Sequence, residues 1–334
     1  MAGSALLSLP GAGRVAPRSY TDRARDELAR DVRAGLARAP RTLPSRWLYD
    51  DVGSALFEAI TFLPEYGLTR AEQRILDHHG ATIASRLPAM PIVVELGAGS
   101  GKKTHRLVSA LASRGPVHFR PVDVSAAALA QCARNLDDLA AVAVEPIEDE
   151  YLPGLDAALA DRGDRPAVVL FLGSTIGNFD RDEADRFLAD LRARLRPGDA
   201  LLLATDLVKP ADVLVDAYDD AAGVTAAFDK NVLARINREL AGDLDLSAFR
   251  HEARWNATDH RIEMHLVATR PVRARIAGAG VTLRMEPGES IWTESSHKYD
   301  LDELPQVAAR AGFALTGQWT DATWPFAESL LEAE

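Results

Sequence analysis

Residues 91–103 read Pro91-Ile-Val-Val-Glu95-Leu-Gly97-Ala-Gly99-Ser-Gly101-Lys-Lys103, and this segment indicates the architecture of the chain. The apolar run over residues 91–96 predicts a buried strand, and the glycines after it precede a helix predicted over residues 104–113. A glycine-rich turn between a strand and a helix is typical of open α/β sheets, where bare backbone and a helix N-terminus can approach a ligand.

The same alternation continues to residue 206. Residues 118–124 (HFRPVDV) and the apolar runs over residues 167–172 and 200–206 predict further strands, with helices over residues 126–139 and 180–194 between them. Ser125 is the expected cap of the first of these helices. Apolar strands that alternate with helices indicate a doubly wound, mainly parallel sheet that is buried on both faces.

The flanking segments follow a different pattern. Thr69 and Glu72 form a capping box, which predicts a helix over residues 69–79. Other helices are predicted over residues 20–41, 210–250 and 301–312, and strands over residues 260–268, 281–286 and 315–319. We therefore expect a core of residues 70–207 plus 298–334, a second α+β domain of residues 19–69 plus 208–297, and a flexible tail over residues 1–18.

Composition excludes several classes of function. The 334 residues carry 38 Lys and Arg against 49 Asp and Glu, and a net charge of −11 argues against nucleic acid or an anionic membrane as partner. The single cysteine, Cys132, excludes a disulfide framework and a Cys-rich zinc site, and no metal is expected. No apolar run approaches the ~20 residues of a membrane span. Pro10 and Gly11 interrupt the N-terminal apolar run, which favours a tail over a secretory signal. We expect a cytoplasmic monomer acting on a small molecule.

The glycine spacing discriminates between ligand classes. A dinucleotide fingerprint, GxGxxG, would need glycine at position 102, which is Lys, and the phosphate-loop spacing GxxxxGK[ST] does not fit either. The pattern E-x-G-x-G-x-G, followed by an acid at the end of the second strand, is instead the form that binds S-adenosylmethionine (SAM). That acid is Asp123, which stands where ribose hydroxyls are usually bound.

Lysine is rare in this chain, yet two of the five lysines are adjacent, at Lys102 and Lys103. Cations in the first turn of a helix oppose its macrodipole, at a cost of about 0.3–1 kcal/mol each. We therefore expect at least one of them to meet a carboxylate, and the methionyl carboxylate of SAM is the candidate partner of Lys103. The alternative is a pair of solvated surface lysines.

Several segments together resemble the SAM-dependent histidine Nα-methyltransferases of ergothioneine biosynthesis, over about residues 20–330. They are LYDDVGSALFEAITFLPEYGLTRAE, VELGAGSGKKT, PVDVS, LFLGSTIGNF, ATDLVK, AYDDAAGVTAAFDKNVLARINREL, IEMHL and WTESSHKY. The resemblance implies a Rossmann-like class I methyltransferase core with a second, substrate-binding domain. It also implies SAM as co-substrate and three successive methyl transfers to the α-amine of L-histidine, which give hercynine.

The resemblance implies site residues as well. Asn178 and Tyr218 would hold the carboxylate of histidine, and Tyr66, Glu294 and Ser296 would hold the imidazole, with Met264 packing nearby. Tyr49 would lie beside the amine, with Phe57 walling that end, and Tyr49 and Asn178 are the catalytic candidates. The expected cofactor contacts are Glu95, Gly97, Gly99, Lys103, Asp123, Ile147 and Gly173. At the adenine contact the chain departs from the family, because the resemblance implies an Asp-aromatic pair where this chain has Pro146-Ile147.

Three alternatives stay open on the sequence. In the first alternative, the methyl acceptor is tryptophan or another aromatic amine, although an indole would leave the Glu294 carboxylate badly partnered. An NAD-dependent oxidoreductase is disfavoured by Lys102 at the third glycine position. A catalytically inactive SAM-binding regulator would not need the acceptor residues. Tyr49 and water are both candidates for taking the proton of the amine.

Overall fold

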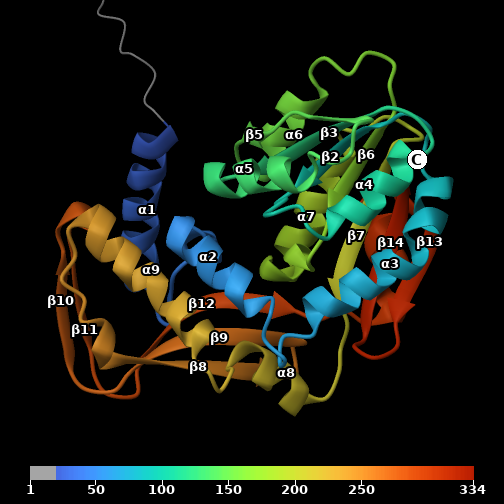
Figure 1. Cartoon of the computed structure of the whole chain (residues 1–334). Coiled ribbons are helices and arrows are strands. Elements are labelled where there is room, and N and C mark those ends of the chain that lie inside the picture. Colours follow the sequence, from blue (N-terminus) through green and yellow to red (C-terminus); the bar gives the residue numbers. More distant parts are fainter. Residues whose placement is uncertain (1–19) are drawn as a thin grey trace, which may run out of the picture.

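The computed structural model describes residues 20–334, and the tail predicted over residues 1–18 lies outside this range. Figure 1 shows two sheets, a larger one flanked by helices and a smaller one beside α1, α8 and α9. Within residues 20–334, no helix combines the length and the apolarity that crossing a membrane requires.

The larger sheet has eight strands, and seven of them follow the order β13-β14-β7-β6-β2-β3-β4, with β5 also pairing with β3. Its parallel centre confirms the four predicted strands: β2 (Ile92–Leu96), β3 (Val117–Asp123), β6 (Ala167–Phe171) and β7 (Ala200–Asp206). The other strands are β4 (Val142–Val144), β5 (Ile147–Glu148), β13 (Phe313–Asp321) and β14 (Phe326–Ala333).

Strand β14 was not predicted, and only β13 corresponds to the strand expected over residues 315–319. β14 runs antiparallel between β13 and β7, in the interior of the sheet. Its Glu328 is 0% exposed. A charged residue in the middle of a buried strand breaks the apolar run on which strand prediction depends.

Helices cover both faces of this sheet, as a doubly wound arrangement requires. One face is covered by α3 (Leu68–Arg86), α4 (Thr104–Ala112) and α5 (Ala126–Asn135), and the other by α6 (Tyr151–Leu159), α7 (Arg181–Arg192) and α10 (Leu304–Arg310). Along β2, Val93 packs with the first group of helices, whereas Ile92 and Val94 pack with the second. Ser125 caps α5 as predicted, because its side chain accepts from the Ala128 amide.

The capping box predicted at Thr69 and Glu72 is wrong. Helix α3 begins one residue earlier, at Leu68, continues to Arg86 instead of His79, and has no side-chain hydrogen bond at its N-terminus. The Glu72 carboxylate accepts from the amide of Gly173 instead. Glu72 therefore bonds a backbone group outside its own helix and does not cap the N-terminus of α3.

The smaller sheet has the order β1-β12-β9-β8, and β10 and β11 form a separate hairpin. β1 (Arg41–Thr42) pairs with β12 (Ser290–His297), so the N-terminal segment and the late segment share one sheet. The remaining strands are β8 (Phe249–Asn256), β9 (Arg261–Ala268), β10 (Val272–Ile276) and β11 (Val281–Met285). β9 and β11 confirm the predictions over residues 260–268 and 281–286.

Helices α1 (Tyr20–Leu36), α2 (Asp51–Ile60), α8 (Ala211–Tyr218) and α9 (Val224–Leu240) belong to the same region. The predicted helix over residues 210–250 is thus divided into two, because Asp220 accepts from the amides of Val224 and Thr225 and starts α9 anew. The helix predicted over residues 20–41 ends at Leu36, ahead of β1. Short 3₁₀ turns complete the fold: η1 (Ser45–Leu48), η2 (Thr175–Asn178), η3 (Leu246–Ala248), η4 (Ala277–Ala279) and η5 (Leu301–Glu303).

Candidate active site

A cavity of about 2300 Å³ lies between the larger sheet and the smaller one. Gly97, Asp123 and Gly173, at the C-terminal ends of β2, β3 and β6, line one side, and Met264 and Glu294 of β9 and β12 line the other. This is where open α/β sheets bind ligands. The volume exceeds the ~300–1,000 Å³ of a typical ligand site, so a cofactor and a substrate both fit.

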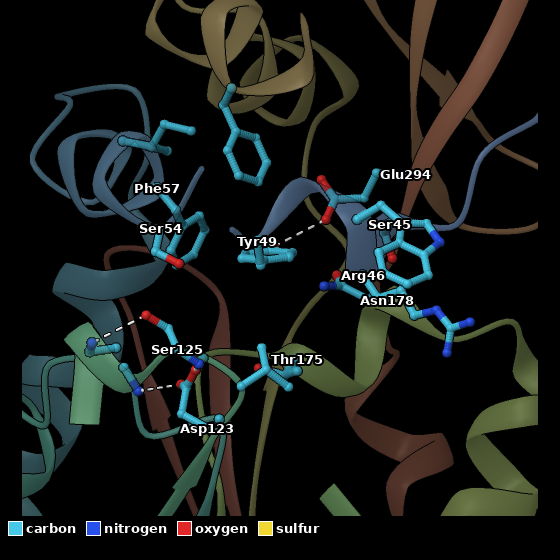
Figure 2. Close-up of a pocket in the computed structure, with 18 of the residues that line it drawn as sticks. Ser45, Arg46, Tyr49, Ser54, Phe57, Asp123, Ser125, Thr175, Asn178 and Glu294 are labelled. Carbon is cyan, nitrogen blue, oxygen red and sulfur yellow. Dashed lines mark hydrogen bonds between the residues drawn. The ribbon is translucent and has the colours of Figure 1, made fainter. Parts of the chain in front are cut away.

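The cavity brings together all but two of the predicted site residues. It is lined by Tyr49, Phe57, Tyr66, Gly97, Gly99, Lys103, Asp123, Gly173, Asn178, Tyr218, Met264, Glu294 and Ser296. Figure 2 shows Tyr49 and Glu294 pointing toward each other on one side and Asp123 on the other. Residues that lie far apart in the sequence therefore face one space.

Glu95 and Ile147 are not among the lining residues. Glu95 is 1% exposed and its Oε1 accepts from the Thr104 hydroxyl at 2.6 Å, which ties β2 to the start of α4. Burial raises the pKa of the Glu95 carboxyl to about 8. Ile147 packs against the apolar core instead, and Asp149, Tyr151 and Leu152 line the cavity there.

The glycine loop presents bare backbone to the cavity. At Gly99, φ is +53° and no atom lies within 4 Å of the position that a Cβ would take. Its amide donates to Oδ2 of Asp123 at 2.9 Å, and Oδ1 of Asp123 accepts from the Ser125 amide at 2.9 Å (Figure 2). Position 101 requires glycine for packing, since a Cβ there would lie 2.5 Å from Sγ of Cys132. Asp123 thus fixes a loop that leaves room for a ligand.

The two adjacent lysines both pair with carboxylates of the chain itself. Lys102 lies 2.5 Å from Oε1 of Glu58 and is about half exposed, whereas Lys103 forms an ion pair with the buried Glu72. The reading of two solvated lysines is therefore wrong for Lys103. Glu72 also accepts from the Gly173 amide at 2.6 Å, so it connects both glycine-rich strand ends. Glu72 was missed because its spacing from Thr69 also fits a helix cap.

The opposite end of the cavity has an aromatic wall. The Tyr49 ring lies 5.6 Å from that of Phe57 and 5.3 Å from that of Phe228, and the Phe57 ring lies 6.2 Å from that of Tyr66. Tyr49 stands between η1 and α2. Asp50 next to it accepts from Gly53 as the N-cap of α2 and from Asn231 of α9. Phe228 was not predicted, because an apolar residue within a helix such as α9 does not reveal from the sequence that it faces a cavity.

Glu294 is the carboxyl group beside this wall. It is 6% exposed, and its Oε1 accepts from the Tyr49 hydroxyl at 3.2 Å. Burial, followed by the negative charge of Asp229, raises the pKa of Glu294 to about 8. A carboxyl group with this pKa can donate to a bare ring nitrogen or, once ionised, accept from a ring N–H.

The Tyr218 hydroxyl and Oγ of Ser296 lie 2.7 Å apart. They come from the end of α8 and from β12, and the Tyr66 ring lies 5.9 Å from that of Tyr218. The resemblance assigned Tyr218 to the carboxylate and Ser296 to the imidazole, whereas here the two hydroxyls form one pair. Behind them lies Lys298, which the sequence did not single out.

His251 is a buried histidine whose ring nitrogens both face acceptors. Nδ1 lies 2.7 Å from Oδ2 of Asp229, and Nε2 lies 2.7 Å from the backbone oxygen of Tyr218. Because a carboxylate and a carbonyl only accept, these contacts favour the form of the ring in which both nitrogens carry hydrogen, which is the cation. It sits at the C-terminal end of α8, where positive charge is favourable, and it fixes the backbone of Tyr218.

Replacing His251 by glutamine is expected to lower the free energy of unfolding by about 1–3 kcal/mol in mildly acidic solution. Burial lowers the pKa of His251, but the Asp229 carboxylate and the Tyr218 carbonyl outweigh burial and hold it above 6.5. A raised pKa stabilises the folded state below the unfolded-state pKa, and this effect is lost as the pH rises through the folded-state pKa. Urea unfolding over a pH series should show the difference between wild type and variant shrinking with rising pH. A difference that grows would contradict the cationic ring, and the exposed His78→Gln is the control.

The arrangement suits a transfer between two ligands. One end offers bare backbone, Asp123 and Lys103 to a cofactor, and the other offers aromatic faces, a carboxyl group and a hydroxyl pair. Aromatic faces attract cations, so an amine that gains positive charge is favoured there. In residues 20–334, no group of three or more His, Cys, Asp or Glu side chains is arranged to hold a metal ion.

Comparisons with known proteins agree with this chemistry. The family model described as "Histidine-specific methyltransferase, SAM-dependent" matches residues 28–333. Histidine N-alpha-methyltransferase of Mycobacterium tuberculosis is 44% identical over 305 residues, which are 91% of this chain and 94% of that protein. The enzyme of the same name from Mycolicibacterium smegmatis is 44% identical over 320 residues, covering 92% and 96%. Ergothioneine biosynthesis protein 1 of Neurospora crassa is 31% identical over 288 residues, which are 84% of this chain and 32% of that protein.

Proposed function

The chain belongs to the family of SAM-dependent, histidine-specific methyltransferases, and on this premise we propose that it methylates the α-amine of L-histidine three times, giving hercynine for ergothioneine biosynthesis. One observation carries the choice of acceptor. The Glu294 carboxyl group lies beside the aromatic wall and faces the same cavity as the glycine loop. An amino acid with a polar ring and a growing cationic centre matches that combination.

We propose that the ring of histidine binds at Tyr66, Glu294 and Ser296, with Met264 packing nearby. A buried site that bonds both a donor and an acceptor on the ring rejects rings that lack them, because its own polar groups would lose their partners. Asn178 and Tyr218 would then hold the carboxylate. Asn178 stands at the end of η2 and lines the cavity, and its amide can donate to a carboxylate.

Catalysis in this proposal is mainly positioning. Bound SAM supplies an electrophilic methyl group. The Tyr49 hydroxyl donates to Glu294, so its free lone pair can accept an N–H of the amine and orient the nitrogen. The aromatic wall stabilises the quaternary ammonium as it forms. Holding donor and acceptor in line supplies most of the rate increase in such a transfer. Tyr49 and water are the candidates for taking the proton that the amine must lose.

At the cofactor end, we propose that Gly97, Gly99 and Gly173 contact SAM through backbone, that Asp123 takes the ribose hydroxyls and that Lys103 meets the methionyl carboxylate. The fit rests on Gly99, where the space beyond its Cα is open, and on Asp123 at the cavity wall. Because Asp149, Tyr151 and Leu152 line the cavity where Ile147 does not, this segment is the candidate contact for the adenine.

We also propose a division of labour along the chain. Residues 70–207 plus 298–334 form the SAM-binding core, and residues 19–69 plus 208–297 form the substrate domain. The enzyme would work as a cytoplasmic monomer without a resident metal. Size-exclusion chromatography with light scattering, and activity after treatment with a chelator, would test the last two points.

Mass spectrometry of L-histidine incubated with the protein and SAM tests the proposal directly. Products with one, two and three added methyl groups are expected to appear in succession, with the trimethylated product accumulating at the end. L-tryptophan and SAM without protein are the parallel reactions. Turnover of L-tryptophan without turnover of L-histidine would overturn the assignment of the acceptor.

A further inference from the structure

Lys298 is a fully buried lysine that directly follows β12. Glu294, Ser296 and Lys298 alternate along the chain, and alternate residues of a strand share a face. The Lys298 Nζ donates to the Tyr218 hydroxyl at 2.8 Å and to Oγ of Ser296 at 2.8 Å. Lys298 therefore reaches the cavity only through two side chains that line it.

Two buried lysines share one carboxylate at this place. Lys298 Nζ lies 3.0 Å from Oδ2 of Asp206, while Oδ1 of Asp206 accepts from Lys209 at 2.6 Å. Among residues 20–334, no other carboxylate lies within ion-pair distance of either lysine. Burial lowers the pKa of both lysines, to about 8 for Lys209, and Asp206 opposes the change. With both ammonium groups charged and Glu294 in its neutral form, the Asp206, Lys209 and Lys298 cluster carries one net positive charge, because Glu294 is the other carboxyl group whose charge acts on Lys298.

The hydroxyl protons can be counted. Burial holds the pKa of Tyr218 well above its usual range, so the Tyr218 and Ser296 hydroxyls each keep their own proton while their oxygens accept from Lys298. At 2.7 Å one of these hydroxyls donates to the other. The Tyr66 side chain also forms a hydrogen bond to Tyr218, and because this bond lowers the pKa of Tyr218, Tyr66 is its donor. One proton of the Tyr218 and Ser296 pair is then left to point into the cavity. The pair is therefore a donor, and the group that it best fits is a negatively charged acceptor.

We propose that Lys298 is a positioning residue that, through the Tyr218 hydroxyl, selects acceptor substrates with a free carboxylate. The inference rests on the proposed function, in which the α-carboxylate of an amino acid is bound beside Tyr218. The carboxylate supplies the negative charge that the Asp206, Lys209 and Lys298 cluster lacks. Amines and amides of the same ring shape would leave that charge uncompensated.

Calorimetry with S-adenosylhomocysteine present tests the proposal on three ligands that share the imidazole: L-histidine, L-histidinamide and histamine. Wild type is expected to bind L-histidine at least about tenfold more tightly than either of the others. Lys298→Met should weaken L-histidine about tenfold or more and weaken histamine severalfold less, because histamine retains only the ring contact that Lys298 supports through Ser296. Lys298→Arg keeps the charge and should keep most of the preference.

Equal weakening of L-histidine and histamine by Lys298→Met would overturn the proposal, as would an absence of preference in wild type. Lys298→Gln is the second neutral variant if Lys298→Met folds poorly, and the affinity for S-adenosylhomocysteine reports folding in each case. Lys230→Met, a lysine substitution outside the cavity on α9, is the matched control. Failure of wild type to bind L-histidine at all would count against the proposed function, whereas binding without a role for Lys298 would count only against this inference.

Discussion

Replacing Glu294 by alanine should lower kcat/KM for L-histidine by about a hundredfold while leaving the affinity for S-adenosylhomocysteine within about twofold. The Glu294 carboxyl group is buried, and one of its oxygens is occupied by the Tyr49 hydroxyl. The other oxygen has no hydrogen-bond partner among the described residues and is the one available to a ring nitrogen. Truncation removes that partner and leaves both the ring nitrogen and the Tyr49 hydroxyl without the carboxyl group.

Glu294→Gln separates charge from shape. The amide keeps the size of the side chain and one acceptor, so it should lose less activity than alanine. Steady-state kinetics with varied L-histidine and calorimetry with S-adenosylhomocysteine are the two measurements. If the variants lost as much affinity for S-adenosylhomocysteine as activity toward L-histidine, Glu294 would support the fold of the cavity and would not bind the ring.

Lys103→Ala should have two effects, a weaker affinity for SAM and a free energy of unfolding that is lower by about 3–5 kcal/mol. Lys103 is the ion-pair partner of Glu72, which is almost fully buried. Glu328 and Glu95 lie near enough for their charges to raise the pKa of Lys103 along with Glu72, although burial acts against them. Without Lys103, a buried cluster of three acids would have no cation. In the folded enzyme, the carboxylate of SAM would lose its cation as well.

The adjacent lysine is the matched control. Lys102→Ala breaks an exposed pair with Glu58 and should cost less than about 1 kcal/mol with no change in SAM affinity. The double variant Lys103→Met/Glu72→Gln removes both buried charges together, so it should regain stability but not SAM affinity. If SAM affinity returns together with stability, Lys103 serves the fold alone.

The larger sheet is the part of the structure that the sequence predicted best. Its four central strands and the helices after them were expected within a few residues, because strand-like segments alternate with helical ones and the runs over residues 167–172 and 200–206 are almost entirely apolar. β14 was missed because Glu328 interrupts its apolar run. The glycine loop was predicted from the spacing of its glycines, and Asp123 from its position at the end of the second strand. The residues of the substrate end were named through the resemblance to a family, and not from their chemistry alone.

The failures at the site have a common physical cause. Glu72 was interpreted as a cap because Thr69 lies three residues before it, yet its partners are Lys103 and the Gly173 amide, far away in the chain. Lys298 lies within the segment WTESSHKY, but it contacts Asp206 only because the ends of β7 and β12 lie side by side in the fold. His251 and Phe228 gave no local sign of their neighbours.

The class of fold and the glycine loop follow from the sequence alone, because hydrophobic periodicity and glycine spacing are local properties that can be recognised without knowing the tertiary partners. The pairing of charges was decided only by the tertiary structure. Lys103 meets Glu72, and Lys298 shares Asp206 with Lys209. Burial is what gives these contacts their energy, and burial depends on which segments the folded chain brings together.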